Sequence, residues 1–551
     1  MFDRTQLQPI VADASTTPST ALDSGLNLLS TAPPVTHPMA LWKDPALYLV
    51  GLAALFVCLP FASYVHWLGD EGAWLHGAER LLRGQPVHTG FFALTPGVYV
   101  VTAGWMTLFG PGIAAMRTLA LCTILGIALL AYSACRSVSG SRPLAACCAI
   151  AWVLTTQGTW TTISHHWMSA LACMATLVVA LYAVENPSRA VPALVAAGLF
   201  AGTAASVTGT RGLAALVIAV AASVRTPKPL RATLALTAAV AVTPCLAVLT
   251  MLAAGAIHWT DLQASFSLVE RFASTQGLPF GAGADPQSRP IIVLFPLAAV
   301  LLAGVVARGG WRLLLAPRTG VILAAAVSAF ICCFPRADAA HIAFNAPLAL
   351  PLFTWASSHL LAPSSVARRL APWVLAAAIL PSGWSLSKLT AKVLARPEIQ
   401  VARGTVRLGE GTDPRDLTRL LADISNVNPA DSFFFYPYDP MLPYLTGRAH
   451  VTAQDLFTPG YTTPEQYRAT CESVVGKAEW VVVDKRWSDP RVITSAFPNI
   501  SDGNPPEKAA FEKAIDASFQ TVASYPRYEL RKRTTDATPE ACSGITRQAS
   551  L

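Results

Sequence analysis

The chain has 551 residues, of which 53% are hydrophobic and only 13% are charged, about half the charged share of an ordinary soluble domain. Long continuous apolar runs indicate helices that cross a bilayer and exclude a transmembrane β-barrel, whose strands alternate in polarity. The net charge of +8 does not indicate a nucleic-acid partner, because most Lys and Arg residues lie in short loops between the apolar runs.

Residues 1–44 are rich in Ser, Thr, Pro and Ala and contain neither an apolar h-region nor a cleavage site. We interpret them as a disordered cytoplasmic tail and not as a signal peptide. The first membrane span is expected at about Leu47–Val65, where the apolar run is long enough to cross a bilayer.

Asp70 and Glu71 follow this span directly and open a long first exterior loop, residues 66–112. Two adjacent carboxylates at the exit of a span are costly unless they lie in a wet, polar cavity. The alternative is that they only mark the headgroup boundary. Apolar residues at helical spacing in Ala73–Leu82 predict an amphipathic helix on the membrane surface. Thr95–Phe109 is short for a crossing, so we expect an interfacial or re-entrant helix there.

Further apolar segments continue the predicted bundle, and with the first they make about eleven spans within residues 45–390. They lie at about Ile113–Cys135, Pro143–Thr156, Trp167–Val184, Val191–Val207, Gly212–Val224, Ala232–Ala256, Pro290–Ala307, Gly320–Phe334, Ile342–Leu361 and Ala371–Leu386. The predicted fold class is therefore mainly α, a polytopic transmembrane helix bundle.

The basic residues of the short loops fix the expected orientation. With the N-terminus in the cytoplasm, every basic short loop lies on the cytoplasmic side, as the positive-inside rule requires. These residues are Lys43, Arg136, Arg142, Arg189, Arg225, Lys228, Arg231, Arg308, Arg312, Arg318, Arg368 and Arg369. A full crossing by Thr95–Phe109 would invert the later loops and break this agreement. The odd number of spans puts the C-terminal part outside the cytoplasm.

In this orientation the exterior loops carry a set of ionisable side chains that are candidate site residues. They are Asp70, Glu71, His165, His166, Arg211, Arg336, Asp338 and His341. A carboxylate beside a hydroxyl can accept its proton, which makes Asp70 the candidate general base, with Glu71 supporting it. Arg211 and Arg336 are the candidates to bind a donor phosphate, because a guanidinium offers phosphate a fork of donors.

These assignments have alternatives. Arg211 could be a snorkelling loop residue, and Arg336 and Asp338 could form a local ion pair that only orders their loop. His165 and His166 are candidate substrate-binding residues, with interfacial packing as the alternative. His341 follows Asp338 by three residues, so Asp338 could orient its ring for substrate binding. We predict no metal site and no certain cofactor, because Asp70 and Glu71 supply too few ligands; a divalent metal is only weakly supported.

After Leu386 the composition changes, and residues 391–551 predict a small extracytoplasmic α/β domain. Expected strands lie at Phe433–Pro437, Trp480–Asp484 and Tyr528–Arg531, and expected helices at Pro464–Val475 and Pro506–Ala517. Cys471 and Cys542 are the two cysteines of this part, and they could pair in an oxidising compartment.

The order of these features resembles the GT-C superfamily of membrane glycosyltransferases. This superfamily includes the protein O-mannosyltransferases, the lipid A aminoarabinose transferases and the mycobacterial arabinofuranosyltransferases. The resemblance is carried by Asp70-Glu71 after the first span and by Arg80–Pro86, Thr95–Tyr99, Leu108–Gly110, Met116-Arg117 and Tyr438–Arg448. The last of these looks like the start of the soluble domain in some bacterial members.

The resemblance implies an inverting hexosyl- or pentosyltransferase of the bacterial inner membrane. It would move a sugar from a polyprenyl-phosphate donor to an unidentified periplasmic acceptor, which could be a glycolipid, a polysaccharide or a protein. Asp70 matches the position of the family's catalytic acidic residue, and Glu71 is its neighbour.

Two departures from the family pattern bear on the mechanism. Gln157–His166 lacks the second acidic motif of the oligosaccharyltransferases, which argues against a metal-dependent mechanism of that kind. Leu94-Thr95 stand where aminoarabinose transferases have a lysine before the proline, so phosphate binding would shift to Arg211 and Arg336.

The alternative functions are a polytopic transporter or lipid flippase, and a non-catalytic envelope assembly protein. Paired repeats and broken midplane helices, which are usual in transporters, are not evident.

Overall fold

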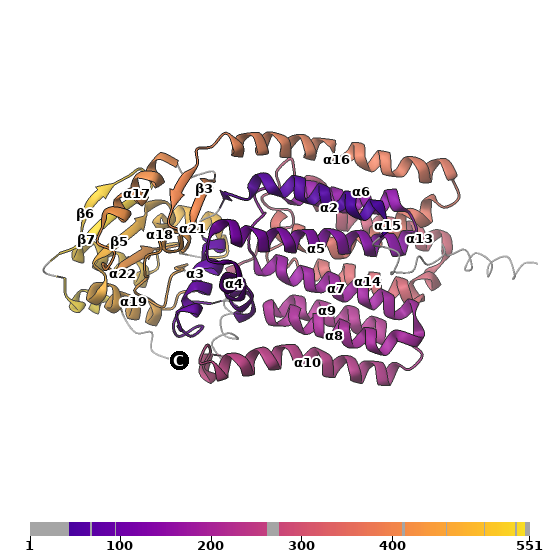
Figure 1. Cartoon of the computed structure of the whole chain (residues 1–551), viewed down its shortest axis with the longest axis horizontal. Helices are drawn as coiled ribbons and strands as arrows, with labels where there is room; N and C mark the ends of the chain where they lie inside the picture. Colours follow the sequence, from indigo (N-terminus) through magenta and orange to yellow (C-terminus); the bar gives the residue numbers. More distant parts are fainter. Residues whose placement is uncertain are drawn as a thin grey trace, which may run out of the picture.

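The computed structural model describes residues 43–66, 69–93, 95–261, 275–409, 414–458, 460–500, 502–534 and 537–545. The tail predicted at residues 1–44 lies outside the described residues apart from Lys43 and Asp44. The described chain is mostly helical, as predicted. Helices run side by side in a bundle, and an α/β domain lies at one end of it (Figure 1).

Every segment predicted as a span contains a helix, although the first, Leu47–Val65, leaves its α-helix at Cys58 and ends in a short strand, Tyr64–Val65. The bundle helices are α2 (Pro45–Cys58), α5 (Ile113–Ser139), α6 (Arg142–Thr156), α7 (His165–Glu185), α8 (Ala190–Val207), α9 (Gly209–Ser223), α10 (Pro229–Ala253), α12 (Arg289–Ile292), α13 (Leu294–Gly309), α14 (Pro317–Ile331), α15 (Ala339–Leu361) and α16 (Ser365–Leu394). Within the described residues, five helices are long and apolar enough to cross a membrane: α5, α7, α8 with the 3-10 turn before it, α10 and α16. Several others are shorter apolar helices, so the count of about eleven spans remains a prediction.

Side-chain caps set where several bundle helices begin. Ser164 accepts a hydrogen bond from the backbone nitrogen of His166 at 3.1 Å, and Asp338 accepts one from the backbone nitrogen of His341 at 2.9 Å. Such caps stabilise a helix start by about 1 kcal/mol each. These two caps therefore hold the first turns of α7 and α15, the turns that carry the predicted histidines.

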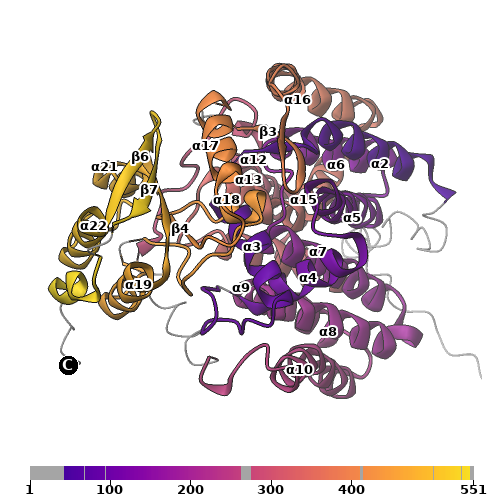
Figure 2. The same ribbon diagram turned by 60° about the vertical axis from the view of Figure 1, so that its left-hand side comes forward.

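The helix after the first span is buried and does not lie on a membrane surface. This helix, α3 (Asp70–Leu82), is buried from Glu71 to Arg80 and lies between α4 (Pro96–Phe109) and α18 (Met441–Thr446) (Figure 2). The predicted helix is confirmed, but its predicted surface location is wrong. Its polar face is covered because the C-terminal domain supplies partners: Arg80 donates to the carbonyl oxygen of Thr452 at 2.7 Å, and Glu79 pairs with Arg403.

A glycine makes the close contact between α3 and the domain possible. A Cβ atom on Gly72 would lie 2.1 Å from the backbone nitrogen of Met441, far inside van der Waals distance. The backbone of α3 therefore touches the first turn of α18 directly, and a Cβ atom at this position would force the two backbones to shift apart.

The main sheet of the domain has the order β4-β5-β7-β6. β4 (Phe433–Tyr436) runs parallel to β5 (Trp480–Asp484), and β7 (Tyr528–Arg533) is antiparallel to both β5 and β6 (Phe519–Ser524). The three predicted strands are confirmed, as are the predicted helices, which are α19 (Pro464–Lys477) and α22 (Pro506–Ser518). β6 was not predicted.

β4 and β5 are buried on both faces of the sheet, which explains their unbroken apolar runs. Phe434 and Val481 pack on one face with residues of α19 and α22. Phe433 and Val482 pack on the other face with α17 (Pro414–Asn426), α18 and α3. The disulfide Cys471–Cys542 is formed on the first of these faces, joining α19 to the 3-10 turn Pro539–Gly544.

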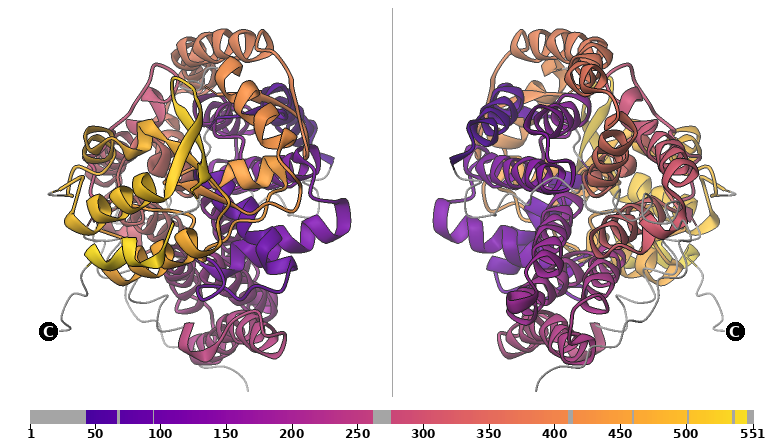
Figure 3. Two further views of the ribbon diagram at one scale, coloured as in Figure 1. Left: turned by 90° about the vertical axis from the view of Figure 1, so that its left-hand side faces the viewer. Right: turned by 90° about the vertical axis from the view of Figure 1, so that its right-hand side faces the viewer.

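A second, small sheet joins the bundle to the domain and was not predicted. β1 (Tyr64–Val65), the last two residues of the predicted first span, pairs in parallel with β3 (Gly404–Leu408), which pairs antiparallel with β2 (Ile399–Val401). The short helices α20 (Lys485–Ser488) and α21 (Pro490–Ala496) complete the domain. Seen along the bundle from the domain end, the domain lies in front of the helix ends (Figure 3).

The Gly72 contact predicts the effect of a single methyl group. We expect Gly72→Ala to lower the melting temperature of the detergent-purified protein, because overpacking against backbone costs about 1–3 kcal/mol. Gly104→Ala on α4 is the matched control, since nothing lies within 4 Å of a Cβ atom there. If the Gly72→Ala protein has the same melting temperature as wild type, the contact between α3 and α18 is contradicted.

Candidate functional site

The helices that carry the predicted site residues reach the end of the bundle on which the domain lies (Figures 1 and 2). They come from the start of α3 (Asp70, Glu71), the first turns of α7 (His165, His166) and α9 (Arg211), and the start of α15 with the loop before it (Arg336, Asp338, His341). The positive dipole ends of α7 and α9 are therefore turned toward this region, and such helix ends favour bound anions.

The Asp70 carboxylate is held by one hydrogen bond and is open on its other oxygen. The hydroxyl of Tyr438 donates to Oδ1 at 2.8 Å, and no hydrogen bond among the described residues uses Oδ2. The side chain remains exposed, although the surrounding protein removes enough hydration to raise the pKa of Asp70 above its usual range. The Tyr438 hydrogen bond and the charges of Arg336 and His341 oppose this rise. Asp70 can therefore reach a ligand and exchange a proton with it.

Glu71 points away from Asp70 and into the bundle. Both of its carboxylate oxygens bind Arg117 of α5, and Oε1 accepts a further hydrogen bond of 3.2 Å from the backbone nitrogen of Ile163. Arg117 also donates to the carbonyl oxygen of Tyr64 at 2.7 Å. Glu71 is 3% exposed because successive helical residues point about 100° apart. The structure places it as an anchor of α3, so it would support Asp70 by positioning and not by contact with a substrate.

Asp338 holds both of its predicted partners. Its Oδ2 accepts a hydrogen bond of 2.9 Å from Nε of Arg336, and its Oδ1 lies 2.8 Å from Nδ1 of His341. Burial alone would raise the pKa of Asp338, but the His341 hydrogen bonds and the Arg336 charge outweigh it and hold the pKa below its usual value. An ionised Asp338 therefore orients the His341 ring, the arrangement that their spacing predicts.

Arg211 is buried and lies among the histidines. It is 2% exposed, so the alternative reading as a snorkelling loop residue is wrong. Its Nη1 lies 2.9 Å from Nδ1 of His166, and its Nε donates to Oδ1 of Asn345 at 3.1 Å. The His166 ring lies 4.8 Å from that of His341, which continues the cluster to Asp338 and Arg336.

His165 closes the cluster on the side of α3. Its ring lies 3.8 Å from that of His166 and 4.6 Å from that of Trp74, one turn after Asp70. A continuous series of contacts therefore runs from α3 through the two histidines to Arg211 and His341. The pair is packed as the alternative reading expects, and its predicted substrate-binding role remains a prediction.

In each of the two predicted phosphate-binding arginines, one guanidinium nitrogen makes no hydrogen bond with a described residue. Arg336 binds Oε1 of Gln276 at 2.7 Å through Nη1, and its Nε binds Asp338. Among the described residues, no hydrogen bond uses the Nη2 group of Arg336 or of Arg211. Each guanidinium is therefore held in place by the protein with donors left for an anion.

Sequence reasoning missed the contribution of the C-terminal domain to this site. Tyr438 binds Asp70 across a separation of 368 residues, and Trp487 packs against the Tyr438 ring at 5.0 Å. Tyr438 stands in the stretch that resembles the start of the soluble domain in some GT-C members, which is the one signal that could have pointed to it. Nothing in the local pattern marks Trp487, Gln276 or Asn345.

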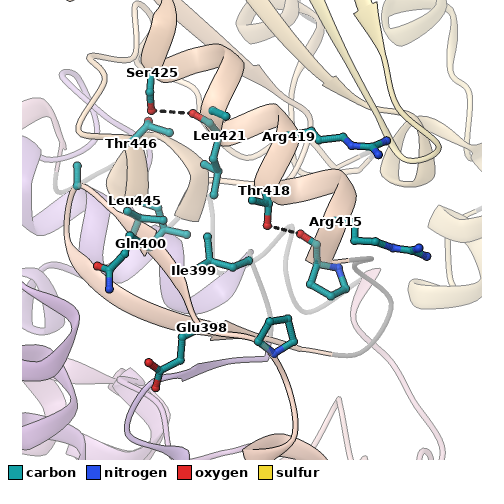
Figure 4. Close-up of a pocket in the computed structure, with 15 residues that line it drawn as sticks. Glu398, Ile399, Gln400, Arg415, Thr418, Arg419, Leu421, Ser425, Leu445 and Thr446 are labelled. Atoms are coloured by element: carbon teal, nitrogen blue, oxygen red, sulfur yellow. Dashed lines mark hydrogen bonds between the residues drawn. The ribbon is translucent and has the colours of Figure 1, made fainter.

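The described residues contain no group of three or more His, Cys, Asp or Glu side chains that could hold a metal ion. The domain does contain an open groove of about 640 Å³ between the β2 segment and α17. In Figure 4, Ile399 and Leu445 lie together in this groove, whereas Arg415 and Arg419 extend away from them. None of the predicted site residues lines it.

Comparison with known proteins supports the fold. No family model matches the chain, and no curated protein sequence matches it. The crystal structure of ArnT from Cupriavidus metallidurans bound to undecaprenyl phosphate is similar to it, with a TM-score of 0.54 and 16% identity over 90% of this chain and 99% of that one. The apo state of that protein gives a TM-score of 0.50 and 15% identity over 91% and 99% of the two chains.

The arabinosyltransferase EmbB from Mycobacterium smegmatis is a more distant match, with 16% identity, a TM-score of 0.41 and coverage of 61% of this chain and 32% of that one. We base no argument on it. The ArnT similarity extends over nearly the whole of both chains, so the predicted GT-C-like fold is confirmed. At this level of identity it establishes the fold alone.

The buried Glu71–Arg117 pair predicts a strong energetic coupling. We expect Arg117→Gln to destabilise the protein by about 3–5 kcal/mol, because it leaves the Glu71 charge buried without a partner. The double variant Glu71→Gln/Arg117→Gln should recover part of this loss, because it removes both charges. Thermal unfolding of the two single variants and the double variant measures the coupling. Additive effects would show that the pair does not hold α3.

Proposed function

We propose that this protein is a membrane glycosyltransferase that moves a sugar from a polyprenyl-phosphate donor to an extracytoplasmic acceptor with inversion at the anomeric carbon. Asp70 acts as the general base, and Arg211 and Arg336 bind the donor phosphate. The observation that carries this proposal is the exposed Asp70 side chain, whose carboxylate is hydrogen-bonded through Oδ1 to Tyr438 and lies within range of the charges of Arg336 and His341.

The chemistry needs few protein groups. The oxygen of an acceptor hydroxyl forms a bond to the anomeric carbon of the sugar while the bond from that carbon to the phosphate oxygen breaks. The hydroxyl proton passes to Asp70, and polyprenyl phosphate leaves with the bonding electrons. A positioned base contributes about 10²–10⁴-fold to such a step. Guanidinium donors stabilise the charge that develops on the leaving phosphate.

Two observations support a lipid-linked donor. ArnT, whose fold this chain shares, was crystallised with undecaprenyl phosphate. In this chain, Arg211 and Arg336 lie at the end of an apolar bundle, beside the starts of α9 and α15, with Nη2 groups unused among the described residues. If the phosphate binds at this end of the bundle, its polyprenyl chain can remain in the bilayer.

The disulfide supports an extracytoplasmic, periplasmic position for the C-terminal domain, because stable disulfides are rare in the reducing cytosol. The basic residues of the short loops independently support a cytoplasmic location for the opposite end of the bundle. The membrane in this proposal is a bacterial inner membrane.

The assigned base predicts a large catalytic defect. We expect Asp70→Asn to lower kcat about 10²–10⁴-fold, because an amide cannot accept the acceptor proton, while donor binding stays within a few-fold of wild type. Turnover of a panel of radiolabelled polyprenyl-phosphate sugars measures the first effect, and equilibrium binding of the same donors measures the second.

Asp285→Asn is the matched control for this substitution, since Asp285 is an exposed loop carboxylate that binds Ser288. It should turn over like wild type. Equal turnover by the Asp70→Asn and wild-type proteins would remove Asp70 from the mechanism. If wild type neither binds nor turns over any donor in the panel, the proposed function itself is wrong.

The predicted compartment can be tested through the cysteines. In protein trapped with acid from growing cells, Cys471 and Cys542 should resist alkylation until a reductant is added, because a periplasmic disulfide is oxidised. Cys122 and Cys245 are exposed thiols on bundle helices and should be alkylated without reductant, which controls for access of the reagent. Immediate alkylation of Cys471 and Cys542 would argue for a cytoplasmic domain.

A further inference from the structure

We propose that Tyr438 is a positioning residue for Asp70, so that the C-terminal domain orients the base and forms part of the active site. This inference rests on the proposed function, because it assigns Tyr438 a role in the step that Asp70 carries out. It goes beyond that function because the domain would position a group that takes part in the reaction. A domain that only covered the site would have no such role.

The hydrogen bond fixes which oxygen of Asp70 is free. The Tyr438 hydroxyl donates to Oδ1 at 2.8 Å, and Oδ2 accepts no hydrogen bond from the described residues. A carboxylate held at one oxygen cannot rotate freely about its terminal bond, so the direction in which Oδ2 presents its lone pairs is set. That oxygen is the one open to an acceptor hydroxyl.

Tyr438 is itself held by an aromatic neighbour. Its ring packs against that of Trp487 at 5.0 Å between centroids. Trp487 lies in the short helix α20, whose start is fixed by Asp484. The Asp484 carboxylate accepts hydrogen bonds from the backbone nitrogens of Arg486 at 2.9 Å and of Trp487 at 3.4 Å.

One arginine joins the segments that carry Trp487 and Tyr438. Arg527 donates from Nε to Oδ2 of Asp484 at 2.9 Å, and its Nη2 reaches Oδ1 of Asp439, the residue after Tyr438, at 3.5 Å. Asp439 is 2% exposed and Asp484 is 0% exposed. The two buried carboxylates therefore share one guanidinium, and each adjoins a segment that carries one member of the Tyr438–Trp487 pair.

This arrangement is costly for a purely structural turn. Burial, together with the neighbouring Asp484 charge, raises the pKa of Asp439 well above its usual range, and apolar side chains would fill the same space at less cost. The network does have a geometric effect, because it fixes the backbone on both sides of the contact to Asp70. We therefore assign it to holding Tyr438 in place.

The groups around Asp70 determine the sign of the expected pH effect. Tyr438 and Tyr461 face it from the domain, and Arg336, Asp338 and His341 face it from the start of α15. Because the Tyr438 hydroxyl donates to the ionised carboxylate, it lowers the pKa of Asp70 relative to the same site without it. Loss of the hydroxyl should therefore raise the pKa of Asp70. The base is active when ionised, so the acidic limb of the rate profile should move to higher pH.

The test compares Tyr438→Phe with Tyr436→Phe. Tyr436 is the matched control, since its hydroxyl donates to Glu512 at 2.9 Å and its ring packs on the face of the sheet that carries α19 and α22. We expect Tyr438→Phe to lower kcat about 10- to 100-fold, the effect of one hydrogen bond to a charged group. KM for the donor should stay within about threefold, and the acidic limb should shift to higher pH. Tyr436→Phe should match wild type in all three.

A measurement without substrate separates this inference from the proposed function. Infrared difference spectra of protein labelled with carboxyl-¹³C aspartate follow the Asp70 carboxyl band, which is assigned by its loss in Asp70→Asn. We expect this band to titrate at higher pH in Tyr438→Phe than in wild type or Tyr436→Phe. If wild type turns over no donor, the proposed function fails, but the titration still decides whether Tyr438 acts on Asp70. An unshifted titration, or wild-type kcat and pH profile in Tyr438→Phe, overturns the inference.

Discussion

The ion pair between Glu71 and Arg117 is the constraint on which the candidate site depends. Both charges are almost fully buried, and a buried charge without its partner costs several kcal/mol, so the pair resists any movement of α3 that would separate Glu71 from Arg117. The backbone of Asp70 is fixed by its neighbour in this way. Asp70 is thus held rigidly while its side chain stays accessible, as a carboxylate in a proposed catalytic role must be.

The C-terminal domain completes the site from the opposite side. It contacts α3 through Gly72, joins the end of the predicted first span through the pairing of β1 with β3, and reaches Asp70 through Tyr438. The starts of α7, α9 and α15 supply the cationic and imidazole groups. The site therefore forms only where bundle and domain meet, and each part supplies a share of its chemistry.

Local pattern was sufficient for much of this architecture. Apolar runs predicted the bundle helices, and unbroken β-type runs predicted β4 and β5, because hydrophobic periodicity is set by the element itself. The assignment of loops to the two sides of the membrane predicted that the site residues lie at one end of the bundle. The spacing of Asp338 and His341 predicted their contact. Partners distant in sequence were not predictable: Arg117 pairs with Glu71 from 46 residues away and Tyr438 binds Asp70 from 368. The burial of α3 was missed for the same reason, since a domain more than 300 residues later covers its polar face.

The proposed function requires that a polyprenyl phosphate bind where bundle and domain meet. The most direct test is photo-crosslinking with a polyprenyl phosphate that carries a diazirine on its first isoprene unit, followed by mass spectrometry of the labelled peptides. We expect saturable labelling of peptides containing the first turns of α7 and α9 or the segment Arg336–His341, with competition by unlabelled polyprenyl phosphate. Saturable labelling confined elsewhere, for example to the groove between β2 and α17, would contradict it.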